Sequence, residues 1–490
     1  MYTLGIDVGS SSVKVSLLNL SDGSCAASAF YPSEEMAITA IKTGWAEQDP
    51  GQWWNNMKSA LKDVLARSAA PKDQIKAIGI SYQMHGLVAL DNKGEVVRPS
   101  IIWCDSRAVE IGDQAFNDLG AEYCLSNCLN SPGNFTASKL KWVKDNEPEL
   151  FARIHKIMLP GDYMAYKLTG RMQTTVSGLT EGIMWDFKKA SIAEELFDYF
   201  GFAKDLIPEI VDTFSEQSQV SEQVASELGL PAGIPVSYRA GDQPNNAFSL
   251  NVLEPGEVAA TAGTSGVVYG VNDTLARDEQ SRVNTFAHVN HSQEQKRLGV
   301  LLCINGTGIL NSWLRKNVAA HLDYAAMNEV AMKAPVGAKG LLVYPFGNGA
   351  ERVLGNANPG GGFKGISFNI HNQSHMLRAA QEGIAYSFRY GVDIMGEMGI
   401  KAKVVRAGKA NMFLSPLFRQ TMANVLDARI ELYDTDGALG AARGAALGAG
   451  LYKNAAEAFE RLTCLETIEP DGDKVAVNEV YNSWKNNLKF

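Results

Sequence analysis

Two short segments of the same design most constrain how this chain folds. Residues 4–15 (LGIDVGSSSVKV) and residues 258–269 (VAATAGTSGVVY) each place small, polar residues between two apolar runs. This pattern predicts a strand, a tight turn and a strand, because glycine and serine let the backbone fold closely. Successive backbone N–H groups in such a turn can bind an anion, and the hydroxyl groups add donors. Two such turns, one in each half, indicate a nucleotide whose phosphates are held between two domains.

The length and the charge of the chain set further limits. Its 490 residues are too many for one hydrophobic core, so we expect two domains, residues 1–249 and 250–490. The net charge of −9 argues against a nucleic-acid surface. No apolar run approaches the roughly 20 residues that cross a membrane. We therefore expect a cytoplasmic protein, with neither nucleic acid nor membrane as a partner.

The pattern of apolar residues predicts an α/β fold. The first 30 residues or so indicate three consecutive strands, and residues 110–230 are richer in helix-forming stretches. A long helix is predicted for residues 374–398, and Ser415 is placed to cap another. Residues 437–448 are almost all small, which predicts a helix packed very closely on a sheet.

Two aspartates lie where apolar strands end. Asp7 precedes the first glycine turn and either binds a divalent cation beside a phosphate or caps the hairpin. The second glycine turn favours the cation. Asp242 either takes the proton of an attacking hydroxyl in phosphoryl transfer or caps a helix. We prefer the catalytic role, because a dense polar cluster, residues 242–246, follows the strand.

Three loops supply further candidates for ligand binding. His85 follows a strand-like run, and we interpret it either as a ligand for sugar hydroxyls or as a structural histidine. Asp105 and Arg107 either bind hydroxyls or pair with each other. The small-residue loop from Gly408 to Asn411 lies between a strand and a helix, which suits a flat adenine or ribose.

Taken together, these motifs resemble the FGGY family of carbohydrate kinases, a branch of the actin-like ATPase superfamily. The matching segments run in order along almost the whole chain: residues 5–14, 45–50, 83–86, 98–107, 159–163, 263–266 and 379–383. The resemblance implies an α/β fold of two actin-like (ribonuclease H-like) ATPase domains, with ATP and Mg²⁺ in the cleft between them. It also implies a homodimer.

The resemblance assigns roles to individual residues. Asp242 becomes the catalytic base, and Asp7 and Asp242 lie at the metal. The sugar-binding residues are Met84, His85, Asp242 and Gln243. The nucleotide-binding residues are Gly9, Ser10, Ser11, Ser12, Lys14, Gly263, Thr264, Ser265, Gly408 and Asn411.

The loop Met84-His85-Gly86 is typical of the family members that phosphorylate ketoses. The family resemblance implies transfer of the γ-phosphate of ATP to a terminal sugar hydroxyl, and we expect the sugar to be D-xylulose. Two segments depart from the usual pattern: many ketose kinases have three glycines where this chain has residues 408–411, and Asn where it has Gln243. The alternatives are a kinase for ribulose, sedoheptulose or glycerol, and a non-catalytic actin-like ATP-binding protein.

Overall fold

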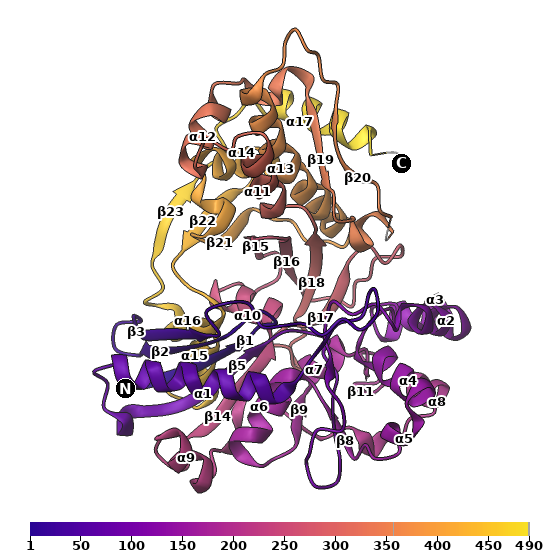
Figure 1. Ribbon diagram of the computed structural model, residues 1–490, viewed down its shortest axis with the longest axis vertical. Helices are drawn as coiled ribbons and strands as arrows, with labels where there is room; N and C mark the ends of the chain where they lie inside the picture. Colours follow the sequence, from indigo (N-terminus) through magenta and orange to yellow (C-terminus); the bar gives the residue numbers. More distant parts are fainter. Residues whose placement is uncertain (356, 489–490) are drawn as a thin grey trace. The chain divides into compact units, whose positions relative to one another are not determined.

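The computed structural model describes residues 1–355 and 357–488 and divides into two compact units (Figure 1). The first unit comprises Met1–Asn251, Phe286–Leu298 and Thr435–Leu462. The second comprises Val252–Thr285, Gly299–Asp434 and the chain from Thr463. The first unit thus includes two segments from beyond residue 250.

A six-stranded sheet forms the centre of the first unit. Its strand order is β13 (Phe214–Gln219), β14 (Pro235–Gly241), β5 (Ile75–Tyr82), β1 (Tyr2–Val8), β2 (Val13–Asn19) and β3 (Cys25–Tyr31). The first three strands along the chain are antiparallel neighbours, as predicted, and the residues 9–12 turn joins β1 to β2. β1, β5 and β14 run parallel to one another, and β13 is antiparallel to β14.

Helices cover both faces of this sheet. On one face lies α1 (Pro50–Arg67), whose start is capped by Asp49, which accepts a hydrogen bond of 2.8 Å from the Gly51 N–H. The buried side chains of α1, including Trp53 and Met57, belong to the same core as Leu4 and Ile6 of β1. Since side chains alternate along a strand, Gly5 between them faces the other side.

That other face is covered by α15 (Gly437–Gly448), the predicted small-residue helix. Figure 1 shows this yellow helix against the indigo strands β1 and β2. A Cβ atom on Gly5 or Gly79 would overlap backbone carbonyls of α15, so only glycine allows this approach. The Thr3 hydroxyl donates to the Ala442 carbonyl at 2.8 Å. The prediction of a closely packed helix is confirmed.

Smaller elements complete the first unit. Its remaining helices are α2 (Val109–Leu119), α3 (Ala121–Asn127), α4 (Thr136–Asn146), α5 (Pro148–Phe151), α6 (Pro160–Thr169), α7 (Val176–Glu181), α8 (Glu194–Phe200), α9 (Glu222–Leu228), α10 (Asp242–Ser249) and α16 (Ala455–Phe459). Its short strands are β4 (Glu47–Gln48), β6 (Val88–Leu90), β7 (Ser100–Ile101), β8 (Lys156–Met158), β9 (Gln173–Thr175), β10 (Trp185–Asp186), β11 (Ser191–Ile192) and β12 (Glu209–Val211). The predicted helix-rich stretch between residues 110 and 230 therefore contains α2 to α9.

The second unit is built on a seven-stranded sheet. The strand order is β17 (Asn284–Ala287), β18 (Leu298–Ile304), β16 (Gly266–Asn272), β15 (Val258–Ala262), β21 (Val404–Gly408), β22 (Arg429–Tyr433) and β23 (Cys464–Ile468). Five of these strands repeat the pattern of the first sheet. The hairpin β15–β16 is antiparallel, β15, β21 and β22 are parallel, and β23 is antiparallel to β22. Both glycine turns therefore lie in the same structural context.

The helices of the second unit are α11 (Gly308–Asn317), α12 (Tyr324–Met332), α13 (Gln373–Glu397), α14 (Pro416–Leu426) and α17 (Lys474–Asn486), and β19 (Leu342–Phe346) pairs with β20 (Gly360–Lys364). The long helix predicted for residues 374–398 is α13. Ser415 caps α14 as predicted, with its hydroxyl accepting a hydrogen bond of 3.1 Å from the Phe418 N–H. In the part of the chain that the structure describes, no helix is both long and apolar enough to span a membrane.

Candidate active site

The candidate site lies where three parallel strands of the first unit end. β1 ends at Val8, β5 at Tyr82 and β14 at Gly241, and these ends lie along the same edge of the sheet. Segments that follow the carboxyl ends of parallel strands meet at that edge. The first glycine turn, the loop containing His85 and the helix that begins with Asp242 are therefore brought together, although they are far apart in the sequence.

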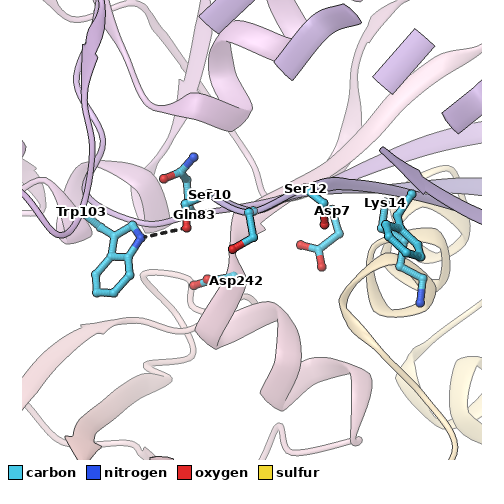
Figure 2. A pocket seen from close by; sticks show the side chains of 10 residues that line it. Asp7, Ser10, Ser12, Lys14, Gln83, Trp103 and Asp242 are labelled. Carbon is cyan, nitrogen blue, oxygen red and sulfur yellow. Dashed lines mark hydrogen bonds between the residues drawn. The ribbon is translucent and has the colours of Figure 1, made fainter. Parts of the chain in front are cut away.

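A cavity of about 500 Å³ opens at this edge, wholly within the first unit. Its lining residues are Asp7, Gly9, Ser10, Ser11, Ser12, Lys14, Phe30, Gln83, Trp103 and Asp242. Figure 2 shows Asp242 below the first glycine turn, with Asp7 and Lys14 on one side of it and Trp103 on the other. Phe30, Gln83 and Trp103 were not predicted as site residues. Gln83 and Trp103 lie in motifs that the sequence analysis noted, whereas nothing in the sequence marks Phe30.

Asp242 is the first residue of α10, directly after the end of β14. Burial raises the pKa of its carboxyl group to about 7, and the nearby charge of Asp7 adds to this shift. Hydrogen bonds from the side chain and backbone of Gln243 lower the pKa in part. A base whose pKa lies near neutral pH is well suited to accept a proton from a hydroxyl group.

Asp7 lies in β1, immediately before Val8 and the turn. Burial raises the pKa of Asp7, Asp436 raises it further, and the Ser81 hydroxyl and the Lys14 amine lower it. The carboxylate lies against the start of α15, where a Cβ on Gly437 would overlap it. A bulkier residue at the start of this helix would displace Asp7.

Asp7 and Asp242 form a pair of carboxylates suited to a divalent cation. Both line the cavity, and burial raises the pKa of each, because it disfavours the negatively charged form. No cluster of three or more His, Cys, Asp or Glu side chains suited to a metal occurs among residues 1–355 and 357–488. Mg²⁺ is commonly held by one or two carboxylates, with water and substrate phosphates completing its coordination. These two residues therefore fit such an ion.

The first glycine turn is held from several sides. The Gly9 N–H donates to the Ser12 carbonyl at 3.0 Å, and the Gln48 side chain donates to the Ser10 carbonyl at 2.7 Å. The Trp103 indole N–H lies 3.4 Å from the Ser10 hydroxyl (Figure 2). These contacts fix the backbone of the turn, and Ser11 at its tip is exposed.

Lys14 lines the cavity from β2, and its amine forms an ion pair of 2.5 Å with Asp436. Asp436 also caps α15, accepting a hydrogen bond of 2.9 Å from the Leu439 N–H. Both side chains of the ion pair are about one-third exposed, so solvent weakens the attraction. Lys14 can therefore exchange Asp436 for another anion.

His85 lies outside the residues that line this cavity, in a loop that holds it firmly. Its backbone φ of 62° is unusual for a residue other than glycine, and the buried Lys139 amine donates to its carbonyl at 2.9 Å. Its Nδ1 donates to the Glu181 carbonyl at 2.9 Å. The ring centroids of Phe135 and Phe286 lie 4.8 and 5.4 Å from that of His85. A residue with an unusual backbone conformation that several contacts hold in place is typical of a functional position.

Met84 is buried beside Gly241, and Gln243 contacts the Asp242 carboxylate. Neither lines the cavity, although both adjoin residues that do. Asp105 and Arg107 pair with each other through a contact of 2.6 Å, and Asp105 also accepts from the Ala46 N–H. The interpretation of these two residues as an ion pair is therefore the one that the structure supports.

The second unit has its own cavity, of about 790 Å³. It is lined by Ala262, Gly263, Thr264, Gly308, Ile309, Asn311, Ser312, Tyr324, Ala325, Asn328, Glu329, Met332, Asn411, Met412, Leu414, Ser415 and Pro416. Of the predicted nucleotide-binding residues, Gly263, Thr264 and Asn411 belong to it. The Gly263 carbonyl accepts a hydrogen bond of 2.8 Å from the Gly308 N–H, which places the second glycine turn beside the start of α11.

Two predicted nucleotide-binding residues of the second unit do not line this cavity. The Ser265 hydroxyl lies 3.5 Å from the Asn305 side chain, and Gly408 is the last residue of β21. The residues of α11 and α12 that line this cavity were not predicted as site residues, because their polar residues have the spacing of an ordinary surface helix.

Comparison with known proteins places the chain in a family. Residues 2–249 match the N-terminal domain of the FGGY family of carbohydrate kinases, and residues 258–451 match its C-terminal domain. A xylulose kinase of Escherichia coli strain K12 is 30% identical over 483 residues, which cover 97% of this chain and 96% of that protein. A xylulose kinase of Bacillus subtilis strain 168 is 28% identical over 94% of this chain and 91% of that protein.

The fold agrees with solved structures. The crystal structure of xylulose kinase from Rhodospirillum rubrum superposes with a TM-score of 0.89 at 25% identity, over 99% of this chain and 98% of that one. The predicted α/β fold of two actin-like ATPase domains is thereby confirmed. The matches to both family domains and the near-complete overlap with these relatives lead to one conclusion: the chain belongs to the FGGY family of carbohydrate kinases.

Proposed function

We propose that this carbohydrate kinase transfers the γ-phosphate of ATP to the terminal hydroxyl of D-xylulose, giving D-xylulose 5-phosphate. The relatives named xylulose kinase support this acceptor. The observation that carries the chemistry is the Asp242 carboxyl group, which lies in the same cavity as the first glycine turn and has a pKa of about 7.

In the proposed reaction, Asp242 accepts the proton of the terminal hydroxyl while the hydroxyl oxygen attacks the γ-phosphorus. The bond from phosphorus to the β,γ-bridging oxygen breaks, and ADP leaves. Removal of the proton makes the oxygen a better nucleophile, which in general contributes a factor of roughly 10²–10⁴ in rate. Met84 lies beside Gly241, directly before Asp242, and Gln243 contacts the Asp242 carboxylate. These two residues and His85 are proposed to orient the sugar.

The backbone N–H groups and hydroxyls of the turn containing Ser10, Ser11 and Ser12 are proposed to bind phosphate oxygens, with Lys14 as a further donor. Asp7 and Asp242 would hold Mg²⁺, which neutralises phosphate charge when bound. In the second unit, Gly263, Thr264 and Ser265 are proposed to contact phosphates as well. The cavity beside them, which includes Asn411, suits the adenosine, and Gly408 is proposed to lie near it.

The first experiment is a coupled assay of ADP release with a panel of acceptors: D-xylulose, ribulose, sedoheptulose and glycerol. We expect D-xylulose to give the highest kcat/KM. A higher kcat/KM with another acceptor would overturn the choice of sugar, and no acceptor-dependent ADP release from any of them would overturn the kinase reaction.

The role of Asp242 is tested by Asp242→Asn, with Asp198→Asn as a control on an exposed carboxylate of α8. We expect kcat to fall by roughly 10²–10⁴-fold in the first variant, with the KM for ATP little changed. The control should behave like the unaltered protein. Normal turnover of Asp242→Asn would show that another group accepts the proton.

The family resemblance also leads us to propose a homodimer located in the cytoplasm. Sedimentation equilibrium at micromolar concentration measures the mass directly. A mass of about 53 kDa, that of one chain, would contradict the dimer.

A further inference from the structure

The carboxyl group of Glu181, at the end of α7, is buried without a partner. The residue is 2% exposed, and neither carboxylate oxygen makes a hydrogen bond. Burial raises the pKa of this carboxyl group well above its ordinary value, and the charges of Asp242 and Asp162 raise it further, while two neighbouring donors outside hydrogen-bond geometry, the Tyr82 hydroxyl and the His85 backbone N–H, lower it. Burying a polar group without a hydrogen bond costs free energy, so a buried, unpaired carboxyl requires an explanation.

Other carboxyl groups of this protein at the same depth are paired. Asp162 is 1% exposed, forms an ion pair of 3.2 Å with Arg239 and accepts a hydrogen bond from the Leu159 N–H. Glu382 is 2% exposed and accepts from Arg378 at 2.8 Å and from the Gly337 N–H at 3.0 Å. These two residues have a structural role that Glu181 does not share.

Glu181 lies between the residues proposed to bind the sugar. Its carbonyl accepts the hydrogen bond from His85. One carboxylate oxygen lies 2.8 Å from the position that a Cβ on Gly241 would take, directly before Asp242. The Met84 Cγ atom lies 2.6 Å from the same position. Glu181 therefore adjoins three parts of the proposed sugar site: Gly241, which precedes the catalytic base, the side chain of Met84, and the ring of His85.

We propose that Glu181 is a specificity residue that hydrogen-bonds a hydroxyl group of the acceptor sugar. This inference rests on the proposed function. The side chain of Met84 and a carboxylate oxygen of Glu181 lie beside the same point next to Gly241, and the three rotatable bonds of Met84 allow it to turn aside without a change in the backbone. A sugar hydroxyl both donates and accepts, so it can pair with the carboxyl group whether or not that group carries its proton.

Such a residue makes the site selective for polyhydroxylated acceptors. An acceptor that lacks the matching hydroxyl would leave the buried carboxyl unpaired in the complex. Sites that hydrogen-bond a substrate hydroxyl reject the analogue without it by large factors, in well-studied cases roughly 10⁴-fold or more.

The test compares kcat/KM for D-xylulose with that for analogues that each lack one hydroxyl other than the terminal one. We expect the unaltered protein to discriminate against at least one analogue by about 10²-fold or more. Glu181→Met should reduce this discrimination at least tenfold, and Glu181→Gln, which keeps a weaker hydrogen-bonding group, should reduce it less. The KM for ATP should stay within about twofold, since Glu181 lies against His85 and Gly241, which belong to neither glycine turn.

The melting temperature of the ligand-free protein separates this role from a structural one. Glu181→Gln should not lower it, because neither carboxylate oxygen has a partner in hydrogen-bond geometry and glutamine keeps an oxygen that faces the same neighbouring donors, Tyr82 and His85. Glu382→Gln, the control at equal burial, should lower it and leave sugar discrimination unchanged.

Two results are clearly distinguishable. If the unaltered protein phosphorylates D-xylulose but both Glu181 variants discriminate against every analogue as it does, Glu181 is not a specificity residue. If the unaltered protein does not phosphorylate D-xylulose, the proposed function itself is wrong. Should Glu181→Met not fold, the Gln variant alone decides, and unchanged discrimination in it overturns the assignment.

Discussion

At the scale of single residues, burial sets the properties of the site more than direct charge contacts do. Desolvation is the largest cause of the raised pKa of Asp242, of Asp7 and of Glu181. Each group sits at the end of a secondary-structure element or next to one, where a strand or helix presents it to the interior. The same burial that makes Asp242 a suitable base also makes its ionised form costly to the folded protein.

That cost predicts how stability depends on pH. Because the pKa of Asp242 is about 7 in the folded protein and 3.8 ordinarily, the folded state binds this proton more tightly than the unfolded chain. Its contribution to stability therefore falls as the pH rises through the interval between those values. We expect ligand-free Asp242→Asn to melt at a higher temperature than the unaltered protein at pH 8, and the difference to shrink toward pH 4. Calorimetry at both pH values measures this, and an equal difference at both would contradict it.

The loop that holds His85 predicts a selective effect on the sugar. His85→Ala should raise the KM for D-xylulose about tenfold, equivalent to about 1.4 kcal/mol of binding, and leave the KM for ATP nearly unchanged. His321→Ala, at an exposed position of the second unit, is the control and should change neither value. Equal increases in both KM values for His85→Ala would indicate that the histidine is structural.

At the scale of elements, α15 determines how closely the first sheet can be covered. Small residues line the face of the helix that meets β1, β5 and β14, and glycines of the strands meet them. The start of this helix also positions Asp436 and adjoins Asp7. The packing of one helix thus affects both stability and the candidate metal site.

Two glycines in helices should respond oppositely to alanine. A Cβ on Gly444 of α15 would lie 2.6 Å from the ring of Tyr238, which is buried and stacked on Phe214. Gly444→Ala should therefore destabilise the protein by about 1–3 kcal/mol. Gly396 of α13 is exposed with open space around it, so Gly396→Ala should be neutral or stabilise by up to about 1 kcal/mol. Denaturant unfolding measures both, and equal stability of the two variants would contradict the close packing of α15.

At the scale of the whole molecule, the first unit depends on a segment from near the end of the chain. Residues 435–462 supply α15 to the sheet formed by residues 2–241, and the strand glycines Gly5 and Gly79 lie directly against this helix. The unit therefore cannot be completed from the first half of the chain.

This predicts that residues 1–251 expressed alone do not form a stable unit. The exposed face should lead to aggregation or to unfolding without cooperativity, whereas the same fragment joined through a flexible linker to residues 435–462 should unfold cooperatively. Circular dichroism with denaturant distinguishes the two. Cooperative unfolding of the shorter fragment would show that α15 is dispensable.

Much of the fold follows from short-range patterns in the sequence. The glycine turns and the start of α14 at Ser415 each depend on a few neighbouring residues, and the structure confirms them. The small residues of α15 likewise predicted close packing. Asp7 and Asp242 could be found as candidates because each directly follows or ends an apolar strand.

Only the tertiary structure decided which distant residues meet. Lys139 and Glu181 lie 54 and 96 positions from His85 and reach it through contacts between separate helices and a loop, which no local pattern encodes. The sequence does not distinguish a buried charged residue from an exposed one, because burial depends on which distant segments pack over that residue. The sequence by itself therefore determined the elements and the family resemblance, whereas long-range packing assigned α15 to the first unit and left Glu181 without a partner beside the site.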